Sequence, residues 1–154
     1  MKWTVTMQAY IFEGITDVTR QRILDCASQE SYAPGAFLFR QGDPVLYFFI
    51  LTEGRVRLSL GREERLAYVD SHPGDLIGWS TLVENERYMG SAQCLVPVKV
   101  LKIDKHRVEE ILLQDPVSGM VFFKNLAVLI GRRLVKSYQA ILSVQGERGA
   151  QPGG

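Results

Sequence analysis

Two stretches in the middle of the chain carry the residue types that bind an anion. Residues 74–83 (Gly-Asp-Leu-Ile-Gly-Trp-Ser-Thr-Leu-Val) contain two glycines around an apolar pair, and residues 87–92 (Arg-Tyr-Met-Gly-Ser-Ala) follow after a polar gap. Gly74 and Gly78 permit positive φ or a close backbone approach, and the residues after Gly78 are typical of one short helical turn. Backbone N–H groups in such a turn point in one direction and hold a phosphate without a catalytic side chain. We therefore predict an anion-binding cradle here.

Patterns typical of catalysis or metal binding do not occur in the sequence. His72 and His106 stand on separate predicted elements, without His-x-His or Glu-x-x-His spacing. A metal site on a barrel scaffold needs clustered histidine and carboxylate ligands, and neither a Gly-x-Ser-x-Gly elbow nor a Walker loop is present. We therefore expect no catalytic residue, no metal and no resident cofactor, and we interpret His106 as a surface or helix-capping residue. The chain is not expected to be an enzyme.

The elements that position the cradle are predicted to be mainly β-strands. Between Ala36 and Asp104, runs of β-branched and aromatic residues are separated by Gly, Pro and Asp at intervals of about 8–12 residues, a pattern typical of a sandwich or barrel. Residues 46–51 are apolar throughout and should be buried on both faces, whereas the alternation in 55–60 predicts one solvent-exposed face. Residues 61–65 are interpreted as a solvated hairpin turn. The predicted strands are 37–40, 46–52, 55–60, 65–70, 90–95 and 98–103.

An N-capped amphipathic helix is predicted before the β-rich region, with its start in the segment Thr16-Asp17-Val18-Thr19. Cys26 is placed on this helix and Cys94 on a strand, so we interpret both thiols as small buried hydrophobes in a reducing compartment. A redox-sensing thiol is the alternative. The residues expected to face inward on this helix are Val18, Ile23, Cys26 and Ala27.

Two helices are predicted after the β-rich region. Asp104 should cap the first, which ends at Gln114 before Asp115-Pro116, and Pro116 suits the first turn of a longer helix reaching about Val144. The first half of the long helix is apolar nearly all round, which predicts burial against the barrel. Its second half has the spacing of a coiled-coil seam, which predicts a homodimer. A monomer that packs the same stripe against its own barrel is the alternative. The seam positions are Ala127, Ile130, Leu134, Ser137, Ile141 and Val144.

The long helix carries four cations and no acid between Pro116 and Gly146. We interpret these cations as a solvated face that complements the negative end of the helix dipole. Contact with phosphate or nucleic acid is the alternative. The four residues are Lys124, Arg132, Arg133 and Lys136.

Composition is that of an average globular protein: 154 residues, 46% apolar, 23% charged and a net charge of +1. This balance implies no nucleic-acid, membrane or acidic partner, and the first eight residues lack an export signal, so a cytoplasmic location is expected. We assign 1–144 to one domain, with a barrel at about 31–104 and C-terminal helices at about 104–144. Residues 145–154 are predicted to be a flexible tail too short for a helix-turn-helix domain, so no direct DNA binding is expected.

The glycine framework resembles the cyclic-nucleotide-binding domain family over roughly residues 12–144. Residues 41–56 (Gln-Gly-Asp-Pro-Val-Leu-Tyr-Phe-Phe-Ile-Leu-Thr-Glu-Gly-Arg-Val) are similar to its Gly-Asp-x-x-x-x-(aromatic)-x-(apolar)-x-x-Gly block. Pro73-Gly74-Asp75 matches its second Gly-Asp, and the cradle is similar to its phosphate-binding cassette. The resemblance implies a jelly-roll β-barrel, or double-stranded β-helix, with a long C-terminal helix, as in sensor domains of the cAMP receptor protein type. It also implies a dimer formed through that helix.

The resemblance implies a ligand such as cAMP or cGMP and assigns residues to it. Residues 132–138 (Arg-Arg-Leu-Val-Lys-Ser-Tyr) are similar to a helix segment whose hydroxyls contact the purine. Two positions depart from the family: Trp79 stands where a Glu bonds the ribose, and Gly90 stands where an Arg pairs with the phosphate. Arg87 is the alternative source of charge. The implied ligand-binding residues are Gly78, Trp79, Ser80, Thr81, Leu82, Arg87, Gly90, Ser91, Ala92, Ser137 and Tyr138.

Two functions remain open at this point. The first is a small-molecule-binding regulatory domain, resembling cyclic-nucleotide sensors, that signals through its C-terminal helix. The second is a degenerate, ligand-free dimerisation or protein-interaction module of the same fold. The two replacements favour the second, whereas the glycine framework does not discriminate, since the same glycines form the barrel turns.

Overall fold

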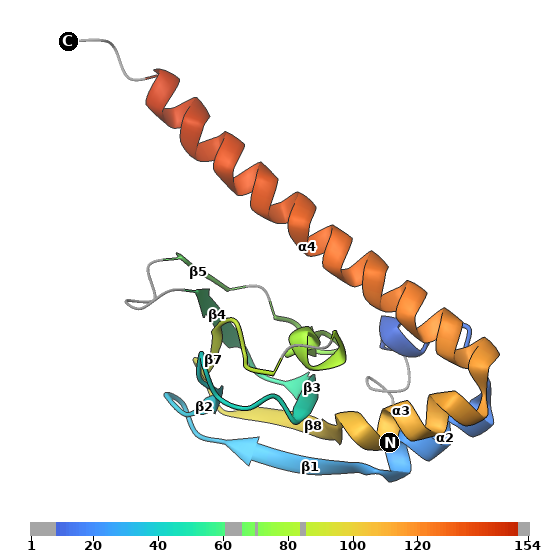
Figure 1. Ribbon diagram of the computed structural model, residues 1–154. Coiled ribbons are helices and arrows are strands. Elements are labelled where there is room, and N and C mark those ends of the chain that lie inside the picture. Colours follow the sequence, from blue (N-terminus) through green and yellow to red (C-terminus); the bar gives the residue numbers. More distant parts are fainter. Residues whose placement is uncertain (1–8, 61–65, 70, 84–85, 151–154) are drawn as a thin grey trace.

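The computed structural model describes residues 9–60, 66–69, 71–83 and 86–150 (Figure 1). The predicted hairpin turn at 61–65 lies outside these residues. In chain order the elements are η1 (Tyr10–Phe12), α2 (Asp17–Asp25), β1 (Ala27–Tyr32), β2 (Phe37–Phe39), β3 (Tyr47–Glu53), β4 (Val56–Leu60), β5 (Leu66–Val69), β6 (Leu76–Ile77), η2 (Trp79–Leu82), β7 (Ser91–Cys94), β8 (Val98–Asp104), α3 (Lys105–Gln114) and α4 (Pro116–Ala150).

The strands form two four-stranded antiparallel sheets, with the orders β1-β8-β3-β6 and β2-β7-β4-β5. The helices flank them, and α4 runs from the sheet region outward (Figure 1). This arrangement confirms the predicted fold class, and each predicted strand is present with ends shifted by a residue or two. Strands β1 and β6 were not predicted. The polar sequence of β1 (Ala-Ser-Gln-Glu-Ser-Tyr) shows no hydrophobic alternation, because β1 is an edge strand that pairs only with β8.

Two hydrophobic clusters lie on opposite faces of the β3-β8 pair. Phe48 and Ile50 belong to the cluster shared with the helices, whereas Phe49 and Leu51 belong to the cluster between the sheets. Successive side chains of a strand point to opposite faces, so a strand apolar at every position is buried on both. The prediction for residues 46–51 is therefore confirmed for these four residues. It is wrong for Leu46, which precedes β3 and is 48% exposed.

The prediction that residues 55–60 form a strand with one solvent-exposed face is only partly correct. Val56 is buried as expected, but Ser59 is buried too and Leu60 is exposed. The hydrophobic alternation therefore fails at the end of β4. Both residues line the cavity described below, which explains why polarity and burial do not correspond there.

Helix α2 has the predicted N-cap but a different inward face. The Thr16 hydroxyl accepts a hydrogen bond from Thr19 N at 3.3 Å. Val18 and Cys26, both predicted to be inside, are exposed. The helix ends at Asp25, and Cys26 is its C-cap, so the last predicted turn is absent. Cys94 is buried as predicted, and the residues of α2 that are buried are Thr19, Ile23 and Leu24.

Helices α3 and α4 begin at the positions that Asp104 and Pro116 led us to predict. The Asp104 carboxylate accepts hydrogen bonds from His106 N (2.8 Å) and Arg107 N (3.2 Å), and Pro116 opens α4. His106 is exposed, and Nδ1 of its ring lies 3.9 Å from Glu109. Helix α4 continues beyond Val144 to Ala150, so residues 145–150 of the predicted flexible tail are helical. Among the described residues, no helix has the length and apolarity to span a membrane.

The first half of α4 is buried on one face only, not all round as predicted. Phe122 and Leu126 are almost fully buried, whereas Val117 and Met120 are more than 70% exposed. The buried face packs against η1 and α3, with Phe122 beside Phe12 at a ring-centroid distance of 6.5 Å. The helix therefore rests on the helical elements near the N-terminus, and its second half leaves the sheets at an angle (Figure 1).

Candidate ligand-binding site

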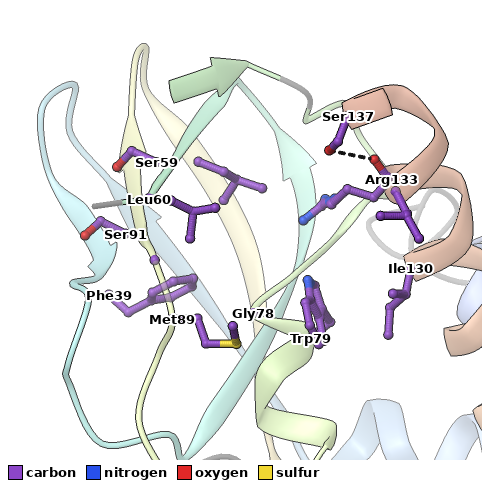
Figure 2. Close-up of a pocket in the computed structure, with 13 residues that line it drawn as sticks. Phe39, Ser59, Leu60, Gly78, Trp79, Met89, Ser91, Ile130, Arg133 and Ser137 are labelled. Atoms are coloured by element: carbon purple, nitrogen blue, oxygen red, sulfur yellow. Dashed lines mark hydrogen bonds between the residues drawn. The ribbon is translucent and has the colours of Figure 1, made fainter. Parts of the chain in front are cut away.

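A cavity of about 360 Å³ lies between the β-strands and helix α4 (Figure 2). Strands β2 and β4, the turn η2, the segment before β7 and helix α4 each contribute to its wall. The cavity therefore includes part of the predicted cradle and closes it with the long helix. Its lining residues are Phe39, Leu58, Ser59, Leu60, Gly78, Trp79, Met89, Gly90, Ser91, Ile130, Arg133, Leu134 and Ser137.

The cradle itself has the predicted local structure. Gly74 and Gly78 have positive φ values of 100° and 84°, and residues 79–82 form one 3₁₀ turn, η2. A glycine adopts this backbone region without steric cost, so the two turns follow from the sequence alone. At Gly78 a Cβ atom would also lie 3.4 Å from the ring of Phe39, which brings the loop close to β2.

Trp79 separates the cavity from a second, smaller one. The indole is half-buried, packs against the helical core cluster, and lines both the 360 Å³ cavity and a neighbouring cavity of about 220 Å³. Ile130 and Arg133 of α4 line both cavities as well. An apolar ring thus occupies the position where the resemblance led one to expect a carboxylate.

Gly90 has no room for a side chain. A Cβ atom built on it would lie 2.5 Å from the carbonyl oxygen of Ser59 and 3.1 Å from Cδ2 of Leu60. The cause is the close pairing of β7 with β4, in which Ser59 is opposite Ser91. The position where the family places its phosphate-binding Arg is therefore closed to any side chain in this arrangement.

Arg87 does not reach the cavity. Its Nη1 donates a hydrogen bond to the carbonyl oxygen of Gly42 at 2.7 Å, and the residue is exposed. Two backbone bonds hold the same segment, from Gly42 N to Tyr88 O (2.9 Å) and from Tyr88 N to Asp43 O (3.0 Å). Arg87 therefore tethers the loop before β7 to the turn at residues 42–44.

Arg133 is the cation that does line the cavity. In Figure 2 its side chain extends from α4 toward the strands, next to Trp79. The residue is half-buried, and within the described chain no hydrogen bond or ion pair engages its guanidinium. Arg133 is half-buried at the cavity wall, whereas Lys124, Arg132 and Lys136 are exposed, as expected of a solvated face. Arg132, its neighbour, instead places its guanidinium 4.6 Å from the ring centroid of Tyr10.

Two hydroxyl groups of the wall, those of Ser137 and Ser91, take part in hydrogen bonds with the backbone. The Ser137 hydroxyl donates to the carbonyl oxygen of Arg133 at 3.0 Å, as drawn in Figure 2. The Ser91 hydroxyl accepts a hydrogen bond from Gln41 N at 2.9 Å. Both residues line the cavity, as the resemblance implied; the Ser137 proton is bonded to the backbone, whereas the Ser91 hydroxyl accepts from the backbone and keeps its proton.

The remaining predicted site residues lie elsewhere. Leu82 is buried in the helical core cluster, and Ala92 is buried between the sheets. Tyr138 is 57% exposed on α4. Ser80 and Thr81 lie in η2, and their side chains are outside the described part of the structure. The structure therefore brings together Gly78, Trp79, Gly90, Ser91 and Ser137 at the cavity wall.

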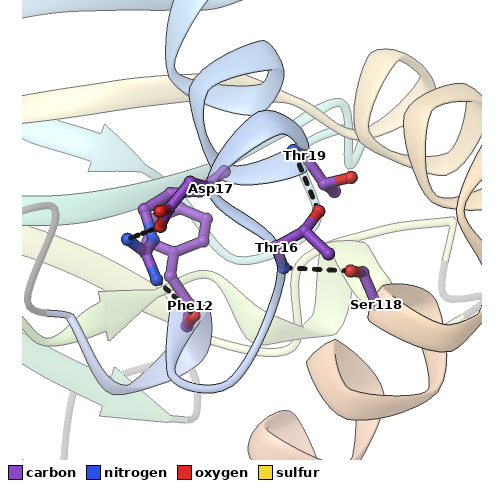
Figure 3. A network of polar contacts seen from close by, with 6 residues as sticks. Phe12, Thr16, Asp17, Thr19 and Ser118 are labelled. Atoms are coloured by element: carbon purple, nitrogen blue, oxygen red, sulfur yellow. Dashed lines mark hydrogen bonds and ion pairs between the residues drawn. The ribbon is translucent and has the colours of Figure 1, made fainter.

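A cluster of hydrogen bonds attaches the start of α4 to the segment around the N-cap of α2, and Figure 3 shows its Thr16–Ser118 and Thr16–Thr19 bonds. The Asp115 carboxylate, at the junction of α3 and α4, accepts from the hydroxyls of Thr19 (2.6 Å) and Thr16 (3.1 Å) and from Ser118 N (3.3 Å). Thr16 N in turn donates to the Ser118 hydroxyl at 3.2 Å. The hydrogen bonds from Ser118 and Thr19 lower the pKa of Asp115 to about 2.

A buried amide adds a second attachment. Asn125 on α4 donates its side-chain NH₂ to the carbonyl oxygens of Ile11 (3.1 Å) and Glu13 (2.7 Å). These two hydrogen bonds satisfy two backbone acceptors near η1. Asn125 is only 7% exposed, so water has little access to these groups. The base of α4 is thus fixed by these bonds, and farther along the helix Ile130, Arg133, Leu134 and Ser137 form its part of the cavity wall.

Sequence reasoning missed Arg133 although a signal for it was present. Ile130, Arg133, Leu134 and Ser137 recur at intervals of three and four residues and therefore share one helix face. Three of them were assigned to the coiled-coil seam, and the cation between them was assigned to solvent. Periodicity identifies the shared face but not the surface it meets, since that depends on how α4 docks on η1 and α3.

Comparison with known proteins gives one family. The model of the cyclic nucleotide-binding domain matches residues 29–115. A cAMP-dependent protein kinase regulatory subunit of Hypocrea atroviridis is 28% identical over 111 residues, which are 72% of this chain and 23% of that protein. The anaerobic regulatory protein of Bacillus subtilis is 29% identical over 119 residues, 74% of this chain and 48% of its own. The chain thus spans from about a quarter to about half of these relatives.

Solved structures agree with this result. A putative cyclic nucleotide-binding protein from Geobacter metallireducens has a TM-score of 0.71 and 26% identity, covering 80% of this chain and 91% of its own. The sensor domain of the transcriptional regulator DNR from Pseudomonas aeruginosa has a TM-score of 0.70 at 18% identity, with 86% and 90% coverage. The second match shows the fold alone.

Proposed function

Because this chain belongs to the cyclic nucleotide-binding domain family, we propose that it is a small-molecule-binding regulatory domain that signals through helix α4. One observation carries the proposal. The 360 Å³ cavity has walls from the β-strands and η2 on one side and from α4 on the other. A bound molecule contacts both, so it stabilises the α4 position in which those contacts form and shifts the population toward it.

The exposed part of α4 provides the output surface. Leu134 at the cavity edge and Ile141 and Val144 beyond it are each about half exposed, and they continue the predicted seam. Two copies that pair along this stripe would bury it, because apolar residues spaced by three and four favour helix pairing. We therefore include a homodimer through α4 in the proposal. The alternative of a stripe packed on its own barrel is supported only near the cavity, at Ile130, Leu134 and Ser137.

A cyclic nucleotide fits the observed wall poorly. The family's ribose contact is replaced by the indole of Trp79, and the position of its phosphate contact, Gly90, is sterically closed. Among the described residues, the large cavity is lined by no acidic side chain that would accept a bond from a ribose hydroxyl. We expect cAMP and cGMP to bind weakly, in the millimolar range or above, because unpaired sugar hydroxyls in an apolar cavity cost about 1–3 kcal/mol each.

The proposal is tested by ligand binding combined with hydrogen exchange of α4. Calorimetric titration with cAMP and cGMP, together with a thermal-shift screen of small organic acids, identifies compounds that bind. Each compound that binds should increase amide protection in residues 130–137 of α4, because Ile130, Arg133, Leu134 and Ser137 of this segment line the cavity. A compound that binds saturably in the cavity and leaves the exchange of α4 unchanged would contradict signalling through the helix.

The second candidate is a ligand-free interaction module. It is favoured by the same two replacements and by Arg87, which binds Gly42 and not the cavity. The two candidates differ in a measurable way. A Leu58→Trp variant fills the cavity from β4. If the protein is a ligand-free module, this variant should leave the dimer dissociation constant unaltered. If it is a ligand-responsive domain, the variant should change that constant in the same direction as a bound compound does, because both fill the cavity.

A further inference from the structure

We propose that the ligand of this cavity is an amphipathic organic anion, an apolar ring system bearing one acid group, and that Arg133 of α4 binds the acid group. This inference rests on the proposed function and specifies its ligand class.

The body of the ligand is indicated by the wall. Most lining side chains are apolar, and they come from both sides of the cavity: Phe39, Leu58, Leu60, Trp79, Met89, Ile130 and Leu134. Pockets of about 300–1,000 Å³ with apolar walls and few polar groups are typical of small-molecule sites. A volume of about 360 Å³ is at the small end of that range and suits a compound of two or three rings. The indole of Trp79 offers such rings a flat face.

The acid group is indicated by Arg133. The guanidinium is half-buried beside apolar side chains, and no acceptor among the described residues bonds it. A cation in such surroundings favours an anionic partner, and a guanidinium bonds a carboxylate, sulfonate or phosphate through two parallel N–H groups. The Ser137 hydroxyl donates its proton to Arg133 O, whereas the Ser91 hydroxyl accepts from Gln41 N and keeps its own O–H as a second donor for the acid.

The position of this charge on α4 has a direct consequence. Trp79, Leu58 and Phe39 belong to the strand side of the cavity, whereas Arg133 belongs to the helix. A ligand that packs its ring on the strand side and pairs its acid with Arg133 links the two sides by a charged contact. The acid group therefore determines whether binding is transmitted to α4.

Two dyes test the proposal because they differ only in the acid. The first is 8-anilinonaphthalene-1-sulfonate, and the second is N-phenyl-1-naphthylamine, which lacks the sulfonate. Each is titrated by fluorescence against the full chain, its Arg133→Met variant and its Arg132→Met variant. Methionine retains apolar length without charge, and Arg132 is the matched control, since it lies beside Tyr10 and does not line the large cavity.

We expect Arg133→Met to weaken sulfonate binding about tenfold, the effect of losing one charge-assisted pair. Binding of the neutral dye should stay within about twofold, and Arg132→Met should change neither. Arg133→Lys should give an intermediate loss, because a lysine keeps the charge without the two-pronged geometry. Leu58→Trp should reduce binding of both dyes, which separates the cavity from the exposed stripe of α4. Circular dichroism and thermal unfolding verify that each variant is folded.

The proposal is overturned if Arg133→Met weakens the binding of both dyes equally or of neither dye. It is overturned as well if both dyes bind the Leu58→Trp variant as tightly as the wild type. It is also overturned if cAMP or cGMP displaces the dyes at micromolar concentration from the wild type and the Arg133→Met variant alike. That last result would leave the proposed regulatory function intact. The regulatory function is tested by a different measurement, the hydrogen exchange of α4. It is contradicted if a ligand binds in the cavity and leaves that exchange unchanged.

Discussion

The carbonyl oxygen of Ser59 lies 2.5 Å from where a Cβ atom of Gly90 would stand. Strands β4 and β7 meet closely at this point, and no side chain fits between them. We expect Gly90→Arg not to create a phosphate site but to destabilise the protein by about 1–3 kcal/mol, the usual cost of overpacking a close contact. Urea unfolding measures this cost.

Gly131 provides the control for that substitution. It lies within α4, and a Cβ atom there meets nothing within 4 Å. Gly131→Ala should therefore stabilise the protein by about 0.5–1 kcal/mol, since alanine restricts the unfolded chain and suits a helix. If Gly90→Ala is as well tolerated as Gly131→Ala, the close contact between β4 and β7 is not as described.

Arg87 is expected to be dispensable for ligand binding. Its Nη1 bonds the carbonyl oxygen of Gly42 at the protein surface, and exposed hydrogen bonds contribute about 0.5–1.5 kcal/mol. Arg87→Ala should cost no more than that and leave the dissociation constants of both dyes unchanged. A dissociation constant for the sulfonate dye that rises in Arg87→Ala but not in Arg133→Met would show that Arg87, not Arg133, supplies the charge.

Asp115 should make stability depend on pH in the acid range. Hydrogen bonds from Ser118 and Thr19 lower its pKa from 3.8 to about 2. A carboxyl whose pKa is lower in the folded state contributes stability that is complete above about pH 4 and is lost as the pH falls toward 2. Asp115→Asn should therefore be less stable than the wild type at pH 6, and the difference should shrink between pH 4 and pH 2.

Urea unfolding of both proteins at several pH values measures this difference. Asp17→Asn is the matched control, because Asp17 is exposed and its ion pair, with Arg20 at 3.0 Å, lies at the protein surface. A constant difference between wild type and Asp115→Asn from pH 6 to pH 2 would mean that the cluster at the α3-α4 junction does not bind the ionised carboxyl.

Dimerisation is predicted to depend on the exposed stripe of α4. Ile141 is 54% exposed and lies on the seam, and burial of such a side chain is worth about 1.5–3 kcal/mol. Ile141→Glu should raise the dimer dissociation constant by at least about tenfold. Gln139→Glu adds the same charge off the seam and should leave association unchanged in sedimentation equilibrium. Equal effects of both substitutions would argue for general charge repulsion and against a seam.

Local signals in the sequence determined the caps, the turns and most strands. Thr16 and Asp104 cap their helices, and Gly74 and Gly78 adopt positive φ, because each of these features depends on a residue and its near neighbours. The glycine framework determined the family for the same reason, since the spacing of the turns is written along the chain.

The tertiary structure decided what depends on docking between distant segments. Strand β1 is a strand because β8 pairs with it, although its own residues are polar. The surroundings of two arginines could not be read from the sequence: Arg87 is held by Gly42, some 45 residues earlier, and Arg133 lines the cavity because of the direction of α4, which packs on η1 and α3. A side chain's type and spacing specify the contacts it can make. The partner it meets depends on packing between elements far apart in the chain, which no local pattern encodes.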